Sequence, residues 1–299
     1  MALELEHVTK RFGKFTAVDD LSLAIPESEM FGFLGANGAG KTTTFRMILG
    51  LLDPSGGKIA WNGKPIDYST SPLIGYLPEE RGLYPKLKVK DQVVYLAKLR
   101  GMAKQDSLKE LTYWLERFKV PENANKKVEE LSKGNQQKIQ FITAVIHKPK
   151  LLILDEPFSG LDPVNVEQLK DAVLDLKNNG TTIVFSSHRM EHVEELCEHL
   201  CIMQKGRPIV HGSLKEIKRS FGRKNLVIHG DYDLGFLAES RGVMKSRQTA
   251  EGIQLQISGE EAAEAIFREV AEKGFVRKFV LEEPSLNDIF IEKAGASYE

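Results

Sequence analysis

The chain has 299 residues, a length that accommodates two domains with separate cores. Its 41 Lys and Arg residues against 42 Asp and Glu residues give a net charge of −1, which argues against nucleic-acid binding through bulk charge. We find no apolar run near the roughly 18 residues that span a bilayer and no secretory signal, so we expect neither membrane spanning nor secretion. The two cysteines, Cys197 and Cys201, are expected on one helix as ordinary reduced thiols.

The first 35 residues alternate apolar and polar side chains, which is typical of strands in a half-buried antiparallel sheet. A strand-like run at 58–61 precedes the turn dipeptide Asn62-Gly63 and predicts a hairpin. The short apolar run at 30–34 predicts a buried strand that leads into a glycine-rich loop.

That loop, GANGAGKT, runs from Gly35 to Thr42 and precedes a helix predicted at 43–49. Its glycines let backbone N–H groups turn toward phosphate, Lys41 reaches the β- and γ-phosphates, and the Thr42 hydroxyl can bind Mg²⁺. The sequence therefore predicts a nucleotide-binding set made of Gly35, Ala36, Asn37, Gly38, Ala39, Gly40, Lys41, Thr42 and Thr43.

From about residue 83 to 150 the apolar spacing becomes helical. Two stripes are predicted to face the core, formed by Val93, Leu96, Ala97 and Leu99, and by Leu108, Leu111, Leu115 and Phe118. The apolar runs at 151–154 and 182–185 predict buried parallel strands, and helices are expected at 164–177 and 191–200. This alternation predicts a doubly wound α/β domain with a helical insertion.

Two carboxylates follow the first of these strands, in the sequence LDEP. Because the carboxyl ends of strands in open α/β sheets bind ligands, Asp155 is predicted to hold Mg²⁺. Since side chains alternate along a strand, we expect Glu156 to point elsewhere and to activate a water for attack on the γ-phosphate. Ser132 and Gly134 precede a helix predicted at 138–146 and predict a second anion site.

The pattern changes near residue 213, so we expect domains at 1–213 and 214–299. The second domain is predicted to be a small α+β domain of the split βαβ type, with strands at 225–229, 243–248, 252–257 and 276–281 and helices at 233–240, 260–273 and 285–294. The helix at 260–273 is expected to bury Ala263, Ile266, Phe267 and Val270. We see no catalytic set there and expect a structural or docking role.

Five motifs occur in the order and spacing of an ABC-transporter ATPase, namely GANGAGKTT, LSKGNQQ, LLILDEP, SGLD and FSSH. The chain resembles this family over about residues 2–213, and an unrelated phosphate-loop kinase or GTPase would have to match the last four motifs by accident. The resemblance implies a phosphate-loop NTPase fold with an antiparallel β-subdomain and a helical subdomain at about 83–150. It also implies an ATPase that uses ATP and Mg²⁺.

The resemblance implies roles for several side chains outside the loop. Glu156 matches the general base, and His188 matches the switch histidine that contacts the γ-phosphate. Phe12 stands where the family places an aromatic ring against adenine, and Val18 where it adds an apolar contact.

The same resemblance implies a homodimer that encloses two ATP molecules. Ser132 and Gly134 match the signature that binds ATP held by the opposite subunit, and Asp162 matches the loop that crosses the dimer. Two residues depart from the common pattern. Glu79 stands where the family usually has glutamine, and we expect it to keep a role at Mg²⁺ with altered charge, while Lys133 adds a cation to the signature.

The motif EPSLNDIF at 283–290 resembles the branch of ATPase subunits that serve two-gene export systems with a separate polytopic membrane subunit. Within that branch the chain is most similar to sodium-extrusion (Nat-type) subunits. The resemblance implies a peripheral protein at the cytoplasmic face of the cell membrane. The membrane partner is expected to dock near Glu79, Arg81, Gly82 and the helical insertion.

Two alternatives remain. A soluble ABC ATPase acting on ribosomes or nucleic acid would differ, because translation-factor types carry two cassettes and DNA-repair types insert long coiled coils. A regulatory module with a decayed site would lack the base or the lysine, and both Glu156 and Lys41 are present.

Overall fold

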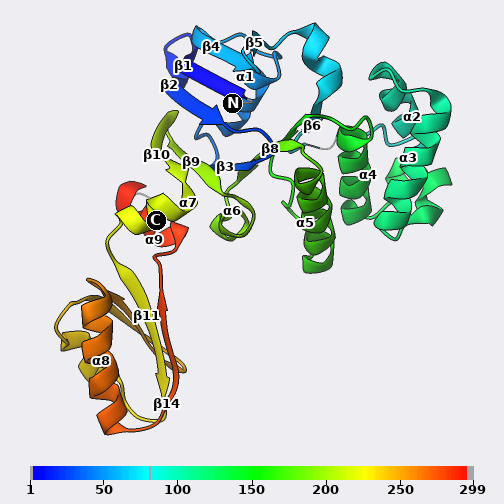
Figure 1. Ribbon diagram of the computed structural model, residues 1–299. Coiled ribbons are helices and arrows are strands. Elements are labelled where there is room, and N and C mark those ends of the chain that lie inside the picture. Colours follow the sequence, from blue (N-terminus) through cyan, green and yellow to red (C-terminus); the bar gives the residue numbers. More distant parts are fainter. Residues whose placement is uncertain (1–2, 81, 295–299) are drawn as a thin grey trace. The chain divides into compact units, whose positions relative to one another are not determined.

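The computed structural model of the protein describes residues 3–80 and 82–294 (Figure 1). The chain divides into two compact units, Met1–His211 and Gly212–Glu299, which we call the N-terminal unit and the C-terminal unit. Within the described residues, no helix has both the length and the apolar character needed to cross a membrane.

A six-stranded sheet forms the centre of the N-terminal unit, with strand order β10-β9-β3-β8-β7-β6. The predicted runs at 151–154 and 182–185 are confirmed as β7 and β8, which pair in parallel, and β3 pairs in parallel with β8 and β9. The strands are β3 (Met30–Leu34), β6 (Ile74–Leu77), β7 (Leu151–Leu154), β8 (Thr182–Ser187), β9 (His199–Gln204) and β10 (Arg207–Ser213).

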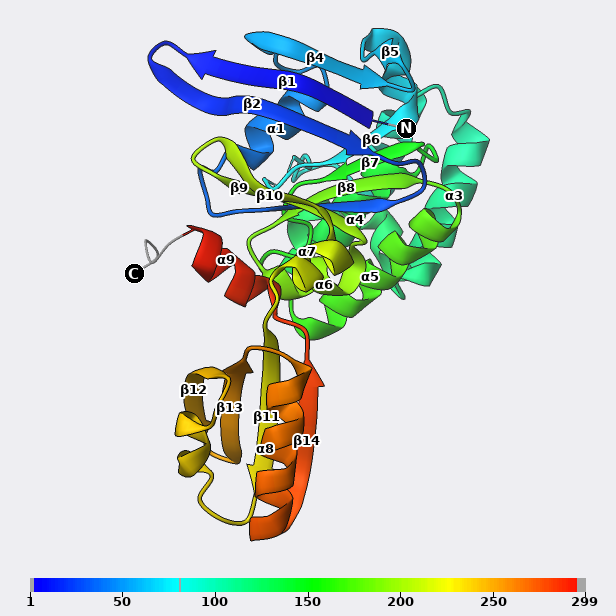
Figure 2. The same cartoon turned by 60° about the vertical axis from the view of Figure 1, so that its left-hand side comes forward.

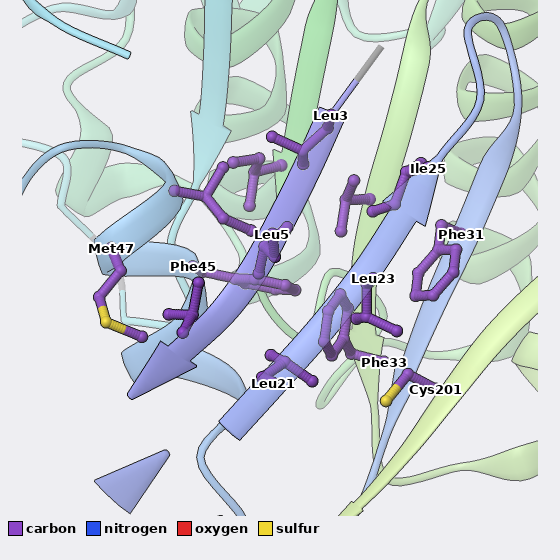
Figure 3. Packing of buried hydrophobic residues seen from close by; sticks show 14 of the residues in the cluster. Leu3, Leu5, Leu21, Leu23, Ile25, Phe31, Phe33, Phe45, Met47 and Cys201 are labelled. Carbon is purple, nitrogen blue, oxygen red and sulfur yellow. The ribbon is translucent and has the colours of Figure 1, made fainter. Parts of the chain in front are cut away.

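A second sheet in this unit is antiparallel, with order β2-β1-β4-β5, as the alternation near the N-terminus predicts. Its strands are β1 (Leu3–Phe12), β2 (Phe15–Ile25), β4 (Gly56–Trp61) and β5 (Lys64–Pro65). Figure 3 shows Leu5 and Leu23 of this sheet clustered with Phe33 of β3 and Phe45 of α1 (Lys41–Ile48). The rings of Phe33 and Phe45 meet edge to face, with centroids 5.4 Å apart, so this core fixes the start of α1 against β3.

Helices cover the other side of the parallel sheet, where Figure 2 shows α4, α5 and α6. The α-helices of the insertion and of this layer are α2 (Val89–Leu99), α3 (Lys104–Arg117), α4 (Lys133–Val145), α5 (Pro163–Asn178) and α6 (Met190–Leu196), with short 3₁₀ turns at Tyr68–Leu73, Pro121–Asn125 and Val128–Glu130. Of the predicted stripes, Leu99 and Leu108 are wrong, because they are exposed near the ends of α2 and α3. Phe118 is buried and joins α3 to α4 through Phe141.

The helix predicted at 191–200 is wrong over its last residues. It ends at Leu196, and β9 begins at His199 because the buried run 200–203 pairs with β3 instead. Cys201 is therefore in a strand, and Cys197 follows the helix rather than sharing a helical face with it. Burial raises the pKa of the Cys201 thiol to about 12 and that of Cys197 well above its usual value, so neither thiol is reactive in the folded chain.

The C-terminal unit is built on a four-stranded antiparallel sheet with order β12-β13-β11-β14. Its elements are α7 (Leu214–Ser220), β11 (Lys224–Gly230), β12 (Val243–Thr249), β13 (Gly252–Ile257), α8 (Glu260–Lys273), β14 (Val276–Glu282) and α9 (Leu286–Ala294). The helix predicted at 233–240 is only a 3₁₀ turn, Gly235–Glu239. α8 lies along one face of the sheet and buries Ala263, Ile266 and Val270, whereas Phe267 is 51% exposed, contrary to prediction (Figure 1).

Candidate nucleotide site

The glycine-rich loop joins the carboxyl end of β3 to the N-terminus of α1, as the sequence predicts. Gly38 and Gly40 have φ of 80° and 106°, in the left-handed region that favours glycine. A Cβ at Gly40 would also lie 2.6 Å from the Ala17 carbonyl oxygen. The loop borders a cavity of 280 Å³, which is lined by residues 36–43 together with Phe15, Ala17, Glu79, Asp155 and Glu156.

Lys41 is buried at the centre of this loop. Its Nζ donates to the carbonyl oxygens of Gly35 at 2.6 Å and Ala36 at 3.3 Å. It also lies 3.7 Å from Glu156 Oε1, and both side chains are only 6% exposed. A buried ammonium group needs acceptors, and these carbonyls supply them where phosphate oxygens would bind.

The two predicted carboxylates lie just beyond the end of β7 at Leu154. The Ser186 hydroxyl donates to Asp155 Oδ1 at 2.5 Å, and Ser186 Oγ in turn accepts a hydrogen bond from the Glu156 N–H at 2.9 Å. Strand alternation is therefore the wrong reason for their divergence, because Glu156 lies outside the strand with φ of 49°. Ser186, at the end of the neighbouring strand β8, holds both residues in place and had no predicted role.

The predicted base and the predicted switch histidine are in direct contact. His188 Nδ1 lies 2.9 Å from Glu156 Oε2, while the histidine ring is half exposed. Burial raises the pKa of Glu156, and the nearby His188 and Lys41 oppose that shift. A carboxylate with a raised pKa, held between the Lys41 ammonium group and the His188 ring, is suited to accepting a proton.

The site contains buried carboxylate oxygens that are suited to a metal–nucleotide ligand. Asp155 Oδ2 and Glu156 Oε1 are buried and accept no hydrogen bond from any described residue. Carboxylate oxygens and a threonine hydroxyl are ligands that Mg²⁺ accepts, and Thr42, Glu79 and Asp155 all line the cavity. The described residues contain no group of three or more His, Cys, Asp or Glu that could hold a metal unaided. Mg²⁺ would therefore need further ligands here, such as phosphate oxygens and water, to complete its shell.

The adenine contacts implied by the resemblance involve residues near one end of the cavity, and they stay predictions. Phe15 and Ala17 line the cavity, whereas Phe12 does not and lies half exposed with Lys10 Nζ 5.3 Å from its ring centroid. Val18 is fully buried in the core. Phe12 and Phe15 lie opposite each other at the tip of the β1–β2 hairpin, so both aromatic residues are at the same end of this hairpin.

The predicted second anion site does not line this cavity. Ser132 caps α4 by accepting the Asn135 N–H at 3.3 Å, and its side chain is exposed. Asn165 of α5 links two predicted residues: its N–H donates to Asp162 Oδ1 at 3.0 Å, and its side-chain amide donates to Asp162 Oδ2. These bonds hold the pKa of Asp162 below its usual value. A Cβ at Gly134 would lie 2.5 Å from Asn165 Nδ2, so the asparagine packs against the glycine.

Gln140 is a further residue that the sequence analysis missed. Its Nε2 donates to the carbonyl oxygens of Pro78 at 3.2 Å and Glu80 at 3.0 Å, which fixes the segment carrying Glu79. The only available signal was a buried amide within an apolar helix. Arg81, expected near a partner's docking surface, lies outside the described residues.

A phosphate loop at a helix N-terminus, with buried acids after another parallel strand of the same sheet, defines a phosphate-loop nucleotide-binding protein. Comparison with known proteins makes this class specific. Residues 18–159 match the family described as ABC transporter, and residues 212–294 match that described as ATP-binding protein DrrA1-3-like, C-terminal domain.

Relatives extend this match over the whole chain. ABC transporter ATP-binding protein YhaQ of Bacillus subtilis is 67% identical, covering 99% of this chain and 100% of the relative. Nod factor export ATP-binding protein I of Cupriavidus metallidurans is 31% identical, covering 98% and 97%. A solved ATP-binding subunit of an ABC transporter is 30% identical, with a TM-score of 0.69, covering 74% of this chain and 94% of that one.

The chain therefore belongs to the ABC transporter ATP-binding proteins, and it carries a DrrA-like C-terminal domain. It is an ATPase subunit coupled to transport, and the predicted phosphate-loop NTPase fold is confirmed.

Proposed function

We propose that this subunit hydrolyses ATP with Mg²⁺ as one half of a homodimer and energises export through a separate polytopic membrane subunit. The observation that carries the catalytic part is the cluster of Lys41, Asp155, Glu156 and His188 around two buried oxygens that accept no hydrogen bond from the described residues. A bound Mg²⁺–triphosphate and its water would supply partners for these two carboxylate oxygens.

Each residue of the cluster has a role set by its position. Lys41 would exchange the Gly35 and Ala36 carbonyls for phosphate oxygens, and Asp155 would hold Mg²⁺ together with Thr42 and Glu79. Glu156 then accepts a proton from the attacking water, and His188 orients the carboxylate and contacts the γ-phosphate. Bound Mg²⁺ neutralises the charge that develops on the phosphate oxygens.

The placement of Ser132 supports the homodimer. This serine is exposed at the N-terminus of α4, and neither it nor Gly134 lines the cavity that holds Lys41. A helix N-terminus with exposed N–H groups attracts anions, so the ATP it binds must be brought by another subunit. Asp162, joined to Gly134 through Asn165, would lie at the same interface.

Export is supported by the name of one full-length relative, a Nod factor export protein. Sodium as cargo rests on the resemblance to Nat-type subunits alone. A chain that docks on the membrane subunit near Glu79 would be a peripheral protein at the cytoplasmic face of the membrane. The nucleic-acid alternative gains no support from the relatives or from the net charge of −1. Copurified membrane protein, followed by ATPase assays with and without Na⁺ in reconstituted vesicles, would test partner and cargo.

The dimer is tested with Glu156→Gln, which should trap ATP in a closed dimer that light scattering detects. Adding Ser132→Asp should abolish this dimer, because aspartate still caps α4 while its charge repels the triphosphate. A Glu156→Gln protein that remains monomeric with ATP and Mg²⁺, or a double variant that dimerises equally well, would contradict the proposal.

A further inference from the structure

The C-terminal unit ends its sheet with an unpaired strand. β14 is the last strand in the order β12-β13-β11-β14, and no described residue pairs with its outer edge. Such an edge presents free N–H and C=O groups in a row and can accept another strand. The side chains of β14 indicate which strand could pair with this edge.

The charges along β14 are symmetric about Val280. The run Lys278-Phe279-Val280-Leu281-Glu282 places a cation and an anion at equal distances on either side of an apolar centre. Lys278 and Glu282 are exposed, and neither forms an ion pair with any described residue. Two copies of such a strand have complementary charges when they pair antiparallel.

We propose that two copies of the chain join through their β14 edges, antiparallel and related by a two-fold axis at Val280. In this register Lys278 lies opposite Glu282 of the second copy, and Phe279 lies opposite Leu281. Opposite residues in an antiparallel pair have adjacent side chains, so the Lys278–Glu282 ion pair and the Phe279–Leu281 apolar pair each form twice. The two sheets become one continuous eight-stranded sheet with both α8 helices on the same face.

An apolar groove beside the strand adds to this contact. A cavity of 470 Å³ lies between α8 and β14, with Phe267, Phe279 and Leu281 among its lining residues. Phe267 is 51% exposed and Leu281 is 37% exposed, and the rings of Phe267 and Phe279 meet with centroids 5.0 Å apart. Because a two-fold axis through Val280 keeps both grooves on one side of the sheet, the pairing brings their apolar rims together.

The opposite edge of the same sheet behaves differently. β12 carries Lys245 and Arg247 and no acidic residue, so self-pairing there would bring positive charges together.

β14 departs from regular pairing with β11 only at Arg277, between its contacts with Gly230 and His229. The regular part of the strand, 278–282, is therefore the part whose charges are symmetric.

The pairing needs no nucleotide, so it is tested separately from the proposed ATP-dependent dimer. Val280→Cys places a thiol on the axis, where opposite Cα atoms lie about 5 Å apart, within the range for a disulfide. The native Cys197 and Cys201 are buried, so the new thiol is the accessible one. In the full chain without ATP, we expect oxidation to give a disulfide-linked dimer, seen on non-reducing gels.

Two matched controls use the same chemistry at other positions. Lys278→Cys places the two thiols about 13 Å apart along the strands, and Ser246→Cys lies on the β12 edge. Neither should cross-link at more than a small fraction of the Val280→Cys rate. Equal rates at the three positions would overturn the proposal.

A charge swap tests the register itself. In the Val280→Cys background, Lys278→Glu or Glu282→Lys turns two attractive pairs into repulsive ones and should slow cross-linking at least about fivefold. The double exchange Lys278→Glu with Glu282→Lys restores opposite charges and should recover the rate. If the double variant stays as slow as the single ones, or if the charges have no effect because they only protect a free edge, the proposed pairing is wrong.

Discussion

The two units differ in what their interiors contain. The buried polar and charged side chains of the described residues, Lys41, Asp155 and Glu156 among them, all belong to the N-terminal unit. The core cluster of the C-terminal unit is apolar, with Ile266 and Val270 of α8 packed on β11 and β13. Burying a charged group costs free energy, so these buried charged side chains indicate a functional site in the N-terminal unit. The C-terminal unit has only its surface with which to act.

The largest expected effect concerns the buried acid. Glu156→Gln should lower ATP turnover by about 10²–10⁴-fold, because it removes the general base while leaving the loop that binds ATP. Steady-state phosphate release measures this, and hydrogen exchange should show the C-terminal unit unchanged. Turnover within a few fold of the parent protein would mean that another group accepts the proton.

The converse change acts on the C-terminal unit alone. Ile266→Ala removes a fully buried side chain from its core and should lower the free energy of unfolding of this unit by about 2–5 kcal/mol. Phe267→Ala, one residue along the helix, should cost only about 1 kcal/mol because this ring is half exposed. Urea titration monitored by hydrogen exchange separates the units. Equal costs would show that Phe267 is buried in solution.

Lys41→Ala should weaken ATP binding by about 10–100-fold, because a charged donor to phosphate is lost. Lys133→Ala is the matched control, since Lys133 is exposed on the signature segment and should not affect nucleotide binding by a single subunit. Calorimetry on dilute protein measures both affinities. If the two variants weaken binding equally, the division between the two halves of the site is incorrect.

The smallest effect is a pH dependence in the N-terminal unit. Burial lowers the pKa of His147 from 6.5 to about 4. Its Nε2 lies 3.2 Å from the Ile74 carbonyl oxygen, and its buried Nδ1 has no hydrogen-bond partner among residues 3–80 and 82–294. Between these pH values the unfolded chain binds the extra proton, so stability falls as pH is lowered from 6.5 to 4. His147→Gln should flatten this slope by up to about 1.4 kcal/mol per pH unit, as measured by urea titration. If His147→Gln leaves the slope unchanged, the pKa of His147 is not lowered in the folded chain.

Features set by local pattern could be predicted from the sequence. The strands at 151–154 and 182–185 are unbroken apolar runs, and such runs become buried parallel strands. The phosphate loop was equally clear, because Gly38 and Gly40 meet backbone requirements that few residues satisfy. The end of α6 was not, because residues 197–201 continue a helical spacing that pairing with β3 overrides.

Features set by distant contacts left little trace in the sequence. Ser186 reaches Asp155 across neighbouring strands, and Gln140 reaches Glu80 across sixty positions of the chain. Asn165 beside Gly134 is a contact of the same kind. Propensity and spacing describe only near neighbours, so the residues that orient a site are harder to predict than those that perform its chemistry.

The bonds of Asn165 carry a consequence for how the subunit moves. One side chain is hydrogen-bonded to Asp162 and packed against Gly134, so the starts of α5 and α4 form a single mechanical piece. A displacement of either helix start is passed to the other within the same chain. In the proposed dimer, the signature segment and the loop that carries Asp162 would therefore leave the interface together rather than one after the other.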